Sequence, residues 1–378
     1  MNLRSNNLAL LSLINLVLFP IAASAVYGNI IEYSIPTPSS NSVDIAVDAA
    51  DNLWFIEQNS SKIGKFIPST QAYEEFDIPY KGSPASIVID AHSLIWLTLA
   101  GDNSIVNFSP ATKKFKRYPI PTSNAGPFGI AVDEGAVIWF TERNGNKVGM
   151  LNVRDETIKE YRISTDNSQP SGIAVDGTGI VWFVESAGNR LASLDLKGRK
   201  ITEYDIPMQF SNPSDIAIDK DGNIWFVEVN GNKIAMFNQR LKKFNEAIIP
   251  RLATVPSNIA IDKAGRIWFT ENRGNRIGVF DPIPATFVEY DIPTNRSLPL
   301  GIAIDSHGIV WFTETDRDAN KIGRLDPSAI ANTDEAKTPS VGAESKSNSI
   351  KIIAIIIFML SIGFFVRYIY RKREKGQG

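Results

Sequence analysis

The seven tryptophans of this chain recur at an almost constant interval. Successive tryptophans are 42 or 43 residues apart, and an aspartate stands six residues before each of them. A period of this length, with strand-like runs between Gly, Asn and Asp turns, is typical of β-propeller blades. The pattern therefore predicts an all-β fold made of seven copies of one blade. The tryptophans are Trp54, Trp96, Trp139, Trp182, Trp225, Trp268 and Trp311.

One repeat contains four short runs that have the composition of β-strands. They cover residues 172–176, 180–185, 190–195 and 200–207 and are separated by turn residues such as Gly177. Short apolar or alternating runs between turns predict antiparallel strands. We name them A to D, from the propeller axis outwards. The large Trp of strand B is expected to pack in the core between blades.

The outer-strand motif, Tyr-Asp-Ile-Pro and its variants, shows how the ring closes. It occurs seven times, but the first copy, Glu32–Pro36, precedes Trp54 and no copy follows Trp311. The N-terminal copy is therefore expected to complete the last blade, whose strands A to C come from residues 301–325. Closure of this kind removes an exposed blade edge. The predicted fold is a seven-bladed β-propeller of four-stranded antiparallel blades, closed by an N-terminal outer strand.

The two ends of the chain are predicted to direct it to a membrane. Residues 1–25 have a basic start, an apolar run and an Ala-Ser-Ala end, as secretory signal peptides do. Residues 350–370 are apolar enough for a transmembrane helix, and residues 371–378 form a basic tail. Between them lie the propeller, 26–327, and a linker, 328–349, rich in small and polar residues. We expect a single-pass type I protein of the cell membrane with an extracellular propeller.

Composition excludes several classes of function. The chain has no cysteine, which excludes disulfides, thiol nucleophiles and thiolate metal sites. Its formal net charge is −2, with acids and bases interspersed, so no nucleic-acid surface is expected. We expect a monomer whose stability comes from packing.

The recurring phrases Trp-Phe-Thr-Glu, Asn-Lys-Ile-Gly, Glu-Tyr-Asp-Ile-Pro and Pro-x-Gly-Ile-Ala resemble the virginiamycin B lyase (streptogramin lyase) family of seven-bladed propellers, over residues 30–326. The resemblance implies magnesium-assisted elimination that opens a cyclic depsipeptide antibiotic. It also implies a general-base His directly after the Pro of a D–A loop, a second His in the preceding blade, and a metal-holding Glu, which Glu314 matches.

The histidines do not follow this pattern. The positions after the Pro hold Ala85, Phe128, Ser171, Ser214, Ser257 and Leu300, and the first blade has Val43 there. The two histidines of the chain, His92 and His307, fall in predicted A–B turns. Because elimination needs a base placed on the proton that it removes, the sequence predicts no acid–base chemistry of the lyase type.

Glutamate follows the Trp by three residues in six blades and has a basic partner across the B–C loop. Glu142 with Lys147 is one example, and the second blade lacks both, having Leu99 and Ser104. Because the second blade lacks both residues together, we predict that in the other six blades they form a cross-strand ion pair that stabilises the B–C hairpin.

Departures from the repeat indicate where function lies. Four polar residues replace the usual Gly near the start of strand A: Asp44, Ser86, Asp215 and Asn258. We define the top face as the end that carries the D–A and B–C loops, and expect these residues to be exposed there, beside the apolar Phe128 and Leu300. Binding sites combine apolar walls with a few polar groups, so these six are the predicted ligand-binding residues.

A second candidate site lies in the last blade. A two-residue insertion produces Glu314-Thr-Asp316-Arg-Asp318, an oxygen-rich loop that could hold Ca²⁺ or Mg²⁺ through Glu314, Asp316 and Asp318. Arg317 lies between the acids, so a solvated loop is the alternative.

Three functions are compatible with these features. We expect a module that binds a small molecule, glycan or protein at its top face. The alternative is a divalent-cation-dependent lyase, or a lactone- or ester-opening enzyme of the gluconolactonase-like type. Its Mg or Ca would be held by Asp44, Asp215, Asn258 or the last-blade loop, and would activate a water in place of the missing His. The third is a structural role at the cell surface.

Overall fold

The computed structural model describes residues 24–26, 30–198 and 200–328. The predicted linker, transmembrane helix and basic tail, and residues 1–23 of the predicted signal peptide, lie outside these ranges. Among the described residues, no helix has the length and hydropathy that a membrane span requires.

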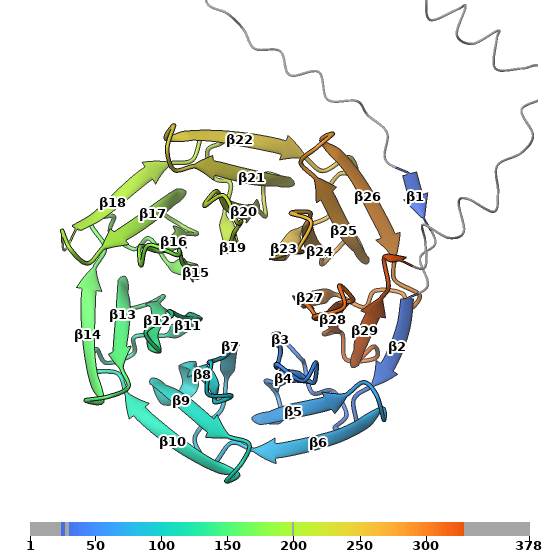
Figure 1. Ribbon diagram of the computed structural model, residues 1–378, viewed down its shortest axis with the longest axis horizontal. Helices are drawn as coiled ribbons and strands as arrows, with labels where there is room; N and C mark the ends of the chain where they lie inside the picture. Colours follow the sequence, from blue (N-terminus) through green and yellow to red (C-terminus); the bar gives the residue numbers. More distant parts are fainter. Residues whose placement is uncertain (1–23, 27–29, 199, 329–378) are drawn as a thin grey trace, which may run out of the picture. The chain divides into compact units, whose positions relative to one another are not determined.

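Seven sheets stand around a central axis, and each contains a four-stranded antiparallel blade; the strands of a blade are consecutive in the chain except in blade 7 (Figure 1). This confirms the predicted all-β, seven-bladed propeller. Blade 1 has β3 (Ile45–Val47), β4 (Leu53–Glu57), β5 (Lys62–Ile67) and β6 (Ala72–Asp77). Blade 2 has β7 (Pro84–Ile89), β8 (Ile95–Leu99), the 3₁₀ turn η1 (Ala100–Asp102), β9 (Ser104–Ser109) and β10 (Lys114–Pro119). Blade 3 has β11 (Pro127–Val132), β12 (Val137–Glu142), β13 (Lys147–Asn152) and β14 (Thr157–Arg162).

The remaining blades repeat this order. Blade 4 has β15 (Pro170–Val175), β16 (Val181–Glu185), β17 (Arg190–Asp195) and β18 (Lys200–Asp205). Blade 5 has β19 (Pro213–Ile218), β20 (Ile224–Glu228), β21 (Lys233–Asn238) and β22 (Lys243–Ile248). Blade 6 has β23 (Pro256–Ile261), β24 (Ile267–Glu271), β25 (Arg276–Asp281) and β26 (Thr286–Asp291). Blade 7 has β27 (Pro299–Ile304), β28 (Val310–Glu314), β29 (Lys321–Leu325) and, as its outer strand, β2 (Ile30–Ser34).

The ring closes through the N-terminal strand, as predicted. β2 pairs antiparallel with β29, from Ile30 opposite Leu325 to Ser34 opposite Lys321. A further segment, β1 (Ser24–Val26), was not expected, because Ser24 and Ala25 belong to the predicted signal peptide. It pairs in parallel with β26 at the outer edge of blade 6.

The six-residue spacing between Asp and Trp has a direct structural cause. In every blade one carboxylate oxygen of the Asp accepts a hydrogen bond from the indole Nε1 of the Trp, at 2.8–3.2 Å. The other oxygen accepts amides of the A–B turn, as Asp305 does from His307 and Ile309. The tryptophans are buried in core clusters that combine residues of adjacent blades, as predicted.

The last position of the Asn-Lys-Ile-Gly phrase holds a small residue because it packs closely against a Phe of the neighbouring strand; blades 4 and 5 have Ala192 and Ala235 there. A Cβ on Gly149 would lie 2.1 Å from the ring of Phe140 on the neighbouring strand. In blade 2 this position holds the larger Val106, and the residue opposite it is Leu97, which is smaller than the Phe of blade 3.

Candidate functional site

A cavity of about 270 Å³ lies where the innermost strands begin, at the top face. The structure brings all six predicted ligand-binding residues into its wall. These are Asp44, Ser86, Phe128, Asp215, Asn258 and Leu300. They come from blades 1, 2, 3, 5, 6 and 7, so the cavity, which we call the axial cavity, is shared by most of the ring.

The two aspartates of the axial cavity connect neighbouring blades. One oxygen of Asp44 accepts the Ser86 hydroxyl at 2.7 Å and the Ile87 amide at 3.0 Å, both from the innermost strand of blade 2. Asp215 accepts the Ile259 amide of blade 6 at 3.0 Å. The expectation that these positions are exposed loop ends is therefore wrong. They are partly buried and help to hold adjacent strands together.

The pKa of each of these two carboxyls is raised. Burial raises the pKa of Asp44 to about 6, although its hydrogen bonds with Ser86 and Ile87 oppose the rise. Burial also raises the pKa of Asp215 to about 7, and the charge of Asp44 adds to the effect. Carboxyls that titrate near neutral pH in a concave site can exchange a proton or bind a cationic group.

The rest of the wall is largely apolar. Val43, Ala85, Phe128 and Leu300 contribute to it, and the Arg143 guanidinium lies 4.4 Å from the centre of the Phe128 ring. Burial lowers the pKa of Arg143.

Sequence reasoning missed two wall residues that follow strand B, Gln58 and Val229. The Gln58 amide donates to the Pro84 carbonyl at 3.0 Å, across to blade 2. A comparison of the residue after each strand-B Glu would have found them, because that position varies between blades.

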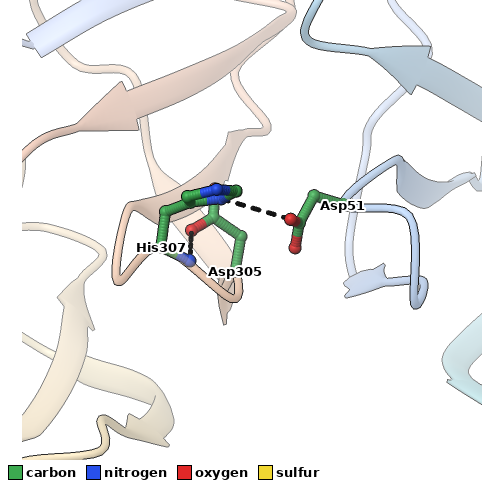
Figure 2. Close-up of side chains that lie close together, drawn as sticks. All are labelled: Asp51, Asp305 and His307. Atoms are coloured by element: carbon green, nitrogen blue, oxygen red, sulfur yellow. Dashed lines mark hydrogen bonds and ion pairs between the residues drawn. The ribbon is translucent and has the colours of Figure 1, made fainter.

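A cluster of ligand-type side chains lies in the A–B turns, at the end opposite the top face. Among the described residues, one group of three Asp, Glu, His or Cys side chains brings its ligand atoms within 4.8 Å of one another: Asp51, Asp305 and His307 (Figure 2). Asp51 belongs to blade 1 and the other two to blade 7, so the group lies at the seam where the ring closes.

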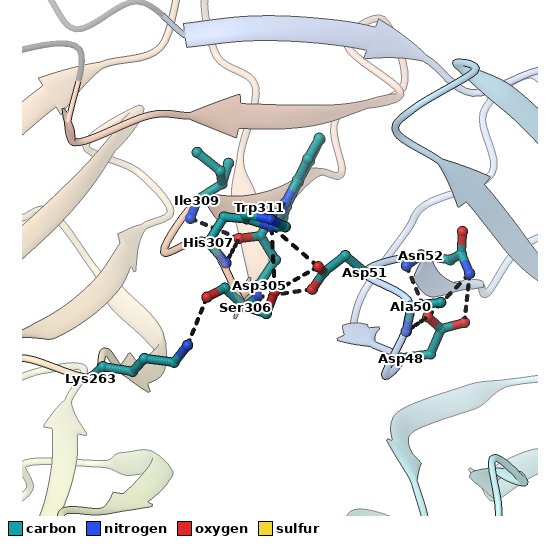
Figure 3. A network of polar contacts seen from close by, with 10 residues as sticks. All are labelled: Asp48, Ala50, Asp51, Asn52, Lys263, Asp305, Ser306, His307, Ile309 and Trp311. Atoms are coloured by element: carbon teal, nitrogen blue, oxygen red, sulfur yellow. Dashed lines mark hydrogen bonds and ion pairs between the residues drawn. The ribbon is translucent and has the colours of Figure 1, made fainter.

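The hydrogen bonds of this cluster connect blade 1 to blade 7. Asp51 accepts the Ser306 amide at 2.9 Å and its hydroxyl at 2.7 Å, and lies 3.2 Å from Nδ1 of His307 (Figure 3). The hydrogen bonds from Ser306 lower the pKa of Asp51. Asp305 is engaged with its own turn and Trp311. The donor set is thus occupied within the protein, and we assign it no metal.

The predicted metal ligands of blade 7 are not brought together. Glu314 ends β28 and is buried, whereas Asp318 is exposed. Asp316 accepts the Asp318 amide at 2.9 Å, as in an ordinary polar turn. Glu314 points into the blade because it continues the alternation of strand B, so the loop does not converge on one point.

The predicted pairs between the strand-B Glu and a basic residue are rearranged in five blades, whereas in blade 6 Arg276 lies 3.9 Å from Glu271 as predicted. In blade 3, Lys147 pairs with Glu160 of the outer strand at 2.8 Å, and Glu160 accepts the Thr122 amide of the preceding D–A loop at 2.9 Å. Glu142 is fully buried beside this pair, and neither of its oxygens has a hydrogen-bond partner among the described residues. The prediction that Lys147 neutralises Glu142 is therefore wrong, because the outer-strand Glu takes the ammonium group.

Buried glutamates of this kind recur in six blades and share a raised pKa. Burial is the largest cause, and the nearby outer-strand Glu adds to it. The pKa rises to about 7 for Glu57 and Glu185, and to about 8 for Glu142, Glu228, Glu271 and Glu314. Blade 2 lacks the whole unit, with Leu99, Ser104 and Arg117 at the three positions. The three residues thus vary together as one structural unit.

Comparison with known proteins finds one matching family and several similar structures. A sequence model described as the virginiamycin B lyase family matches residues 20–231 and 200–343. A structure titled streptogramin B lyase is 31% identical with a TM-score of 0.74, covering 79% of this chain and 97% of its own. Virginiamycin B lyase from Staphylococcus aureus is 27% identical with a TM-score of 0.74, covering 78% of this chain and 98% of its own. No curated protein matches the chain.

Two further structures are informative. One is a catalytically inactive histidine-to-alanine variant of the Staphylococcus aureus enzyme with quinupristin. It is 28% identical with a TM-score of 0.74, covering 78% of this chain and 98% of its own. The other, YCF48 bound to D1 peptide, is 12% identical with a TM-score of 0.65, covering 80% of this chain and 97% of its own. It shares the fold alone. In the present chain His92 and His307 lie in the turns β7–β8 and β27–β28, away from the axial cavity.

Proposed function

The chain belongs to the virginiamycin B lyase family, and we propose that it uses the axial cavity of this fold to bind a ligand without opening a streptogramin ring. One observation carries the proposal: the six departures from the repeat line one cavity, and its described wall residues include two carboxyls and no histidine. An inactive relative differs by the loss of a single His, so that side chain matters for catalysis in the related enzyme. A carboxyl already hydrogen-bonded to the next blade is a poor substitute for a free base.

The chemistry of the cavity limits the ligand. A volume of about 270 Å³ accommodates a side chain or a small-molecule fragment rather than a whole cyclic peptide. Asp44 and Asp215 favour a positively charged or hydrogen-bond-donating group, and Phe128 and Leu300 favour an apolar stem. We propose an alkylammonium or similar cationic group as the part that enters. Its charge would shift both carboxyls to their ionised form.

A matched pair of probes tests this proposal. Isothermal titration of the protein with butylammonium chloride is expected to show millimolar binding at pH 7, and titration with pentanol, similar in size but uncharged, much weaker binding. Changing Asp44 and Asp215 together to Asn keeps the backbone amides bonded to an oxygen and should weaken butylammonium binding at least tenfold, which corresponds to about 1.4 kcal/mol. Equal binding by wild type and variant would rule out the cavity as the cation site.

We also propose that the propeller is displayed outside the cell. The support is the order of the predicted signal peptide, the apolar run at 350–370 and the basic residues after it. Protease added to intact cells should degrade the propeller and leave a small C-terminal fragment. Full protection of the propeller, with cleavage restored by lysis, would place it inside.

The enzyme alternative is favoured only by family membership. Asp44, Asp215 and Asn258 offer oxygen atoms in the cavity, but no third acidic or histidine side chain joins them among the described residues. These residues do not fit a divalent cation site, so we derive no metal-dependent step from them.

A further inference from the structure

Strand D of blade 5 departs from the other blades at two adjacent positions. The residue opposite the first apolar residue of strand C is Tyr or Phe in six blades, but Ala247 in blade 5, where it lies opposite Ile234. The aromatic residues are Tyr33, Phe76, Tyr118, Tyr161, Tyr204 and Tyr290. The next position holds the exposed Ile248, where blades 1, 4 and 6 have Asp.

In the other six blades the Tyr or Phe ring at this position has the same packing partner. There it packs on the strand-B Trp of its own blade, with ring centroids 5.6–6.3 Å apart and planes inclined by 18–36°. Trp225 of blade 5 has no such partner, because Ala247 cannot reach it. Its indole contacts only Phe280 of blade 6 among aromatic rings of the described residues, at 6.1 Å.

The space left by the missing aromatic ring is a cavity that opens at the outer rim between blades 5 and 6. Its volume is about 550 Å³, and its wall contains Trp225, Met236, Phe244, Ala247, Phe280 and Pro282. Trp225 is 6% exposed, the most of the seven tryptophans. The cavity is separate from the axial cavity, with which it shares no residue.

We propose that this cavity binds an aromatic side chain of a partner polypeptide. The six complete blades identify the chemistry of the occupant, since each fills the same space with a Tyr or Phe ring. The surroundings favour a polypeptide over a small molecule. Two of the large hydrophobic side chains exposed in the described chain directly follow residues of the cavity wall, Ile248 after Ala247 and Ile283 after Pro282. Exposed apolar residues beside an apolar cavity are typical of a protein interaction surface.

The outer edge of the neighbouring blade shows how such a segment could lie. β1 pairs in parallel with β26 and adds a fifth strand to blade 6. The outer strand of blade 6 therefore has an edge that accepts another extended chain, which is a common mode of peptide binding. A segment paired along β22 would point alternate side chains toward the face of Ala247.

Fluorine NMR of the full-length protein labelled with 5-fluorotryptophan tests the site. The variant Trp225→Phe assigns the Trp225 signal. Titration with p-cresol, which has the ring of a Tyr side chain, is expected to shift that signal and leave the other six unchanged. Ala247→Tyr or Ala247→Phe restores the residue type of the other blades and should abolish the shift. As a matched control, Tyr204→Ala should make the Trp182 signal of blade 4 responsive. An unresponsive Trp225, or a shift that persists in both Ala247 variants, would overturn the proposal.

A second titration tests the source of the ring. A capped Val-Val-Tyr-Val-Val peptide is expected to bind at least tenfold more tightly than p-cresol to the wild type, and to lose this advantage in Ala247→Tyr. Peptide binding no tighter than that of p-cresol would mean that the cavity serves small aromatic molecules, and would overturn the assignment to a polypeptide. Neither result depends on ligand binding in the axial cavity.

Discussion

Deletion of residues 30–36 is expected to destabilise the propeller by about 5 kcal/mol or more, because it removes the outer strand of blade 7. Tyr33 packs 4.9 Å from Phe66 of blade 1 and 6.2 Å from Trp311 of blade 7, measured between ring centroids. Glu32 pairs with Lys321 at 2.7 Å and accepts the Thr294 amide of the preceding loop at 2.9 Å. The deletion therefore opens contacts with both neighbours of the seam. Thermal and urea unfolding of the purified proteins measure the loss.

A matched truncation at the other end provides the control. Removal of residues 337–378 leaves every described strand in place and should change the unfolding free energy of the propeller little. Equal melting temperatures for the two truncated proteins would show that β2 contributes nothing to closure.

The second large effect is a fall in stability as the pH rises from about 5 to about 8. In the folded state the pKa of the six buried glutamates is raised to about 7 or 8 from an ordinary value of 4.5. Below pH 4.5 these groups are protonated in both states and have no effect. Between pH 4.5 and 8 the unfolded chain has lost protons that the folded protein retains, so unfolding becomes progressively easier. Above pH 8 the difference is constant.

Other acids set the lower limit of the stable range. Although burial opposes it, hydrogen bonds from Lys147 and Thr122 lower the pKa of Glu160, and those from Thr37 and Lys62 lower that of Glu75. A depressed carboxyl pKa contributes stability above the unfolded value that is lost as the pH falls through the folded value. Maximum stability is therefore expected near pH 5.

One substitution isolates the contribution of a single blade. Glu142→Gln has the shape of the protonated acid and cannot ionise. We expect it to stabilise the protein by about 1–3 kcal/mol at pH 8.5 and to be nearly neutral at pH 5. The matched control, Glu160→Gln, removes the partner of Lys147 and should destabilise at pH 7, since it leaves the ammonium group without a carboxylate. A Glu142→Gln variant with the same pH profile as the wild type would contradict the assignment of a raised pKa.

Period and pattern were enough to predict the fold. The Trp spacing, the four runs per repeat and the displaced first copy of the outer-strand motif determine the blade number and the closing strand, and the structure confirms both. Repeats reveal such features because each blade must present the same side chains to its neighbours. The pairing of β1 with β26 could not be predicted, since three residues carry no periodicity.

The position of the candidate site was predictable from the sequence, but the contacts of its residues were not. Residues that broke the repeat at the start of strand A proved to share one cavity, because equivalent positions of a closed ring face the same axis. The partner of a charged side chain depends on how far the side chain extends, which the sequence does not show. For that reason Lys147 was predicted to pair with Glu142 instead of Glu160. The loss of the Tyr at Ala247 was visible in the sequence, but its meaning required knowing that this ring packs on the Trp.

The absence of streptogramin-opening activity is tested most directly by incubation of the purified protein with Mg²⁺ and quinupristin, followed by mass spectrometry of the antibiotic. Ring opening by elimination leaves the mass unchanged, so intact and linear products are separated by chromatography before detection. A virginiamycin B lyase serves as the positive control under the same conditions. We predict that quinupristin remains cyclic, because no histidine is among the described wall residues of the axial cavity. Accumulation of the linear product at a rate comparable to that of the control would contradict it.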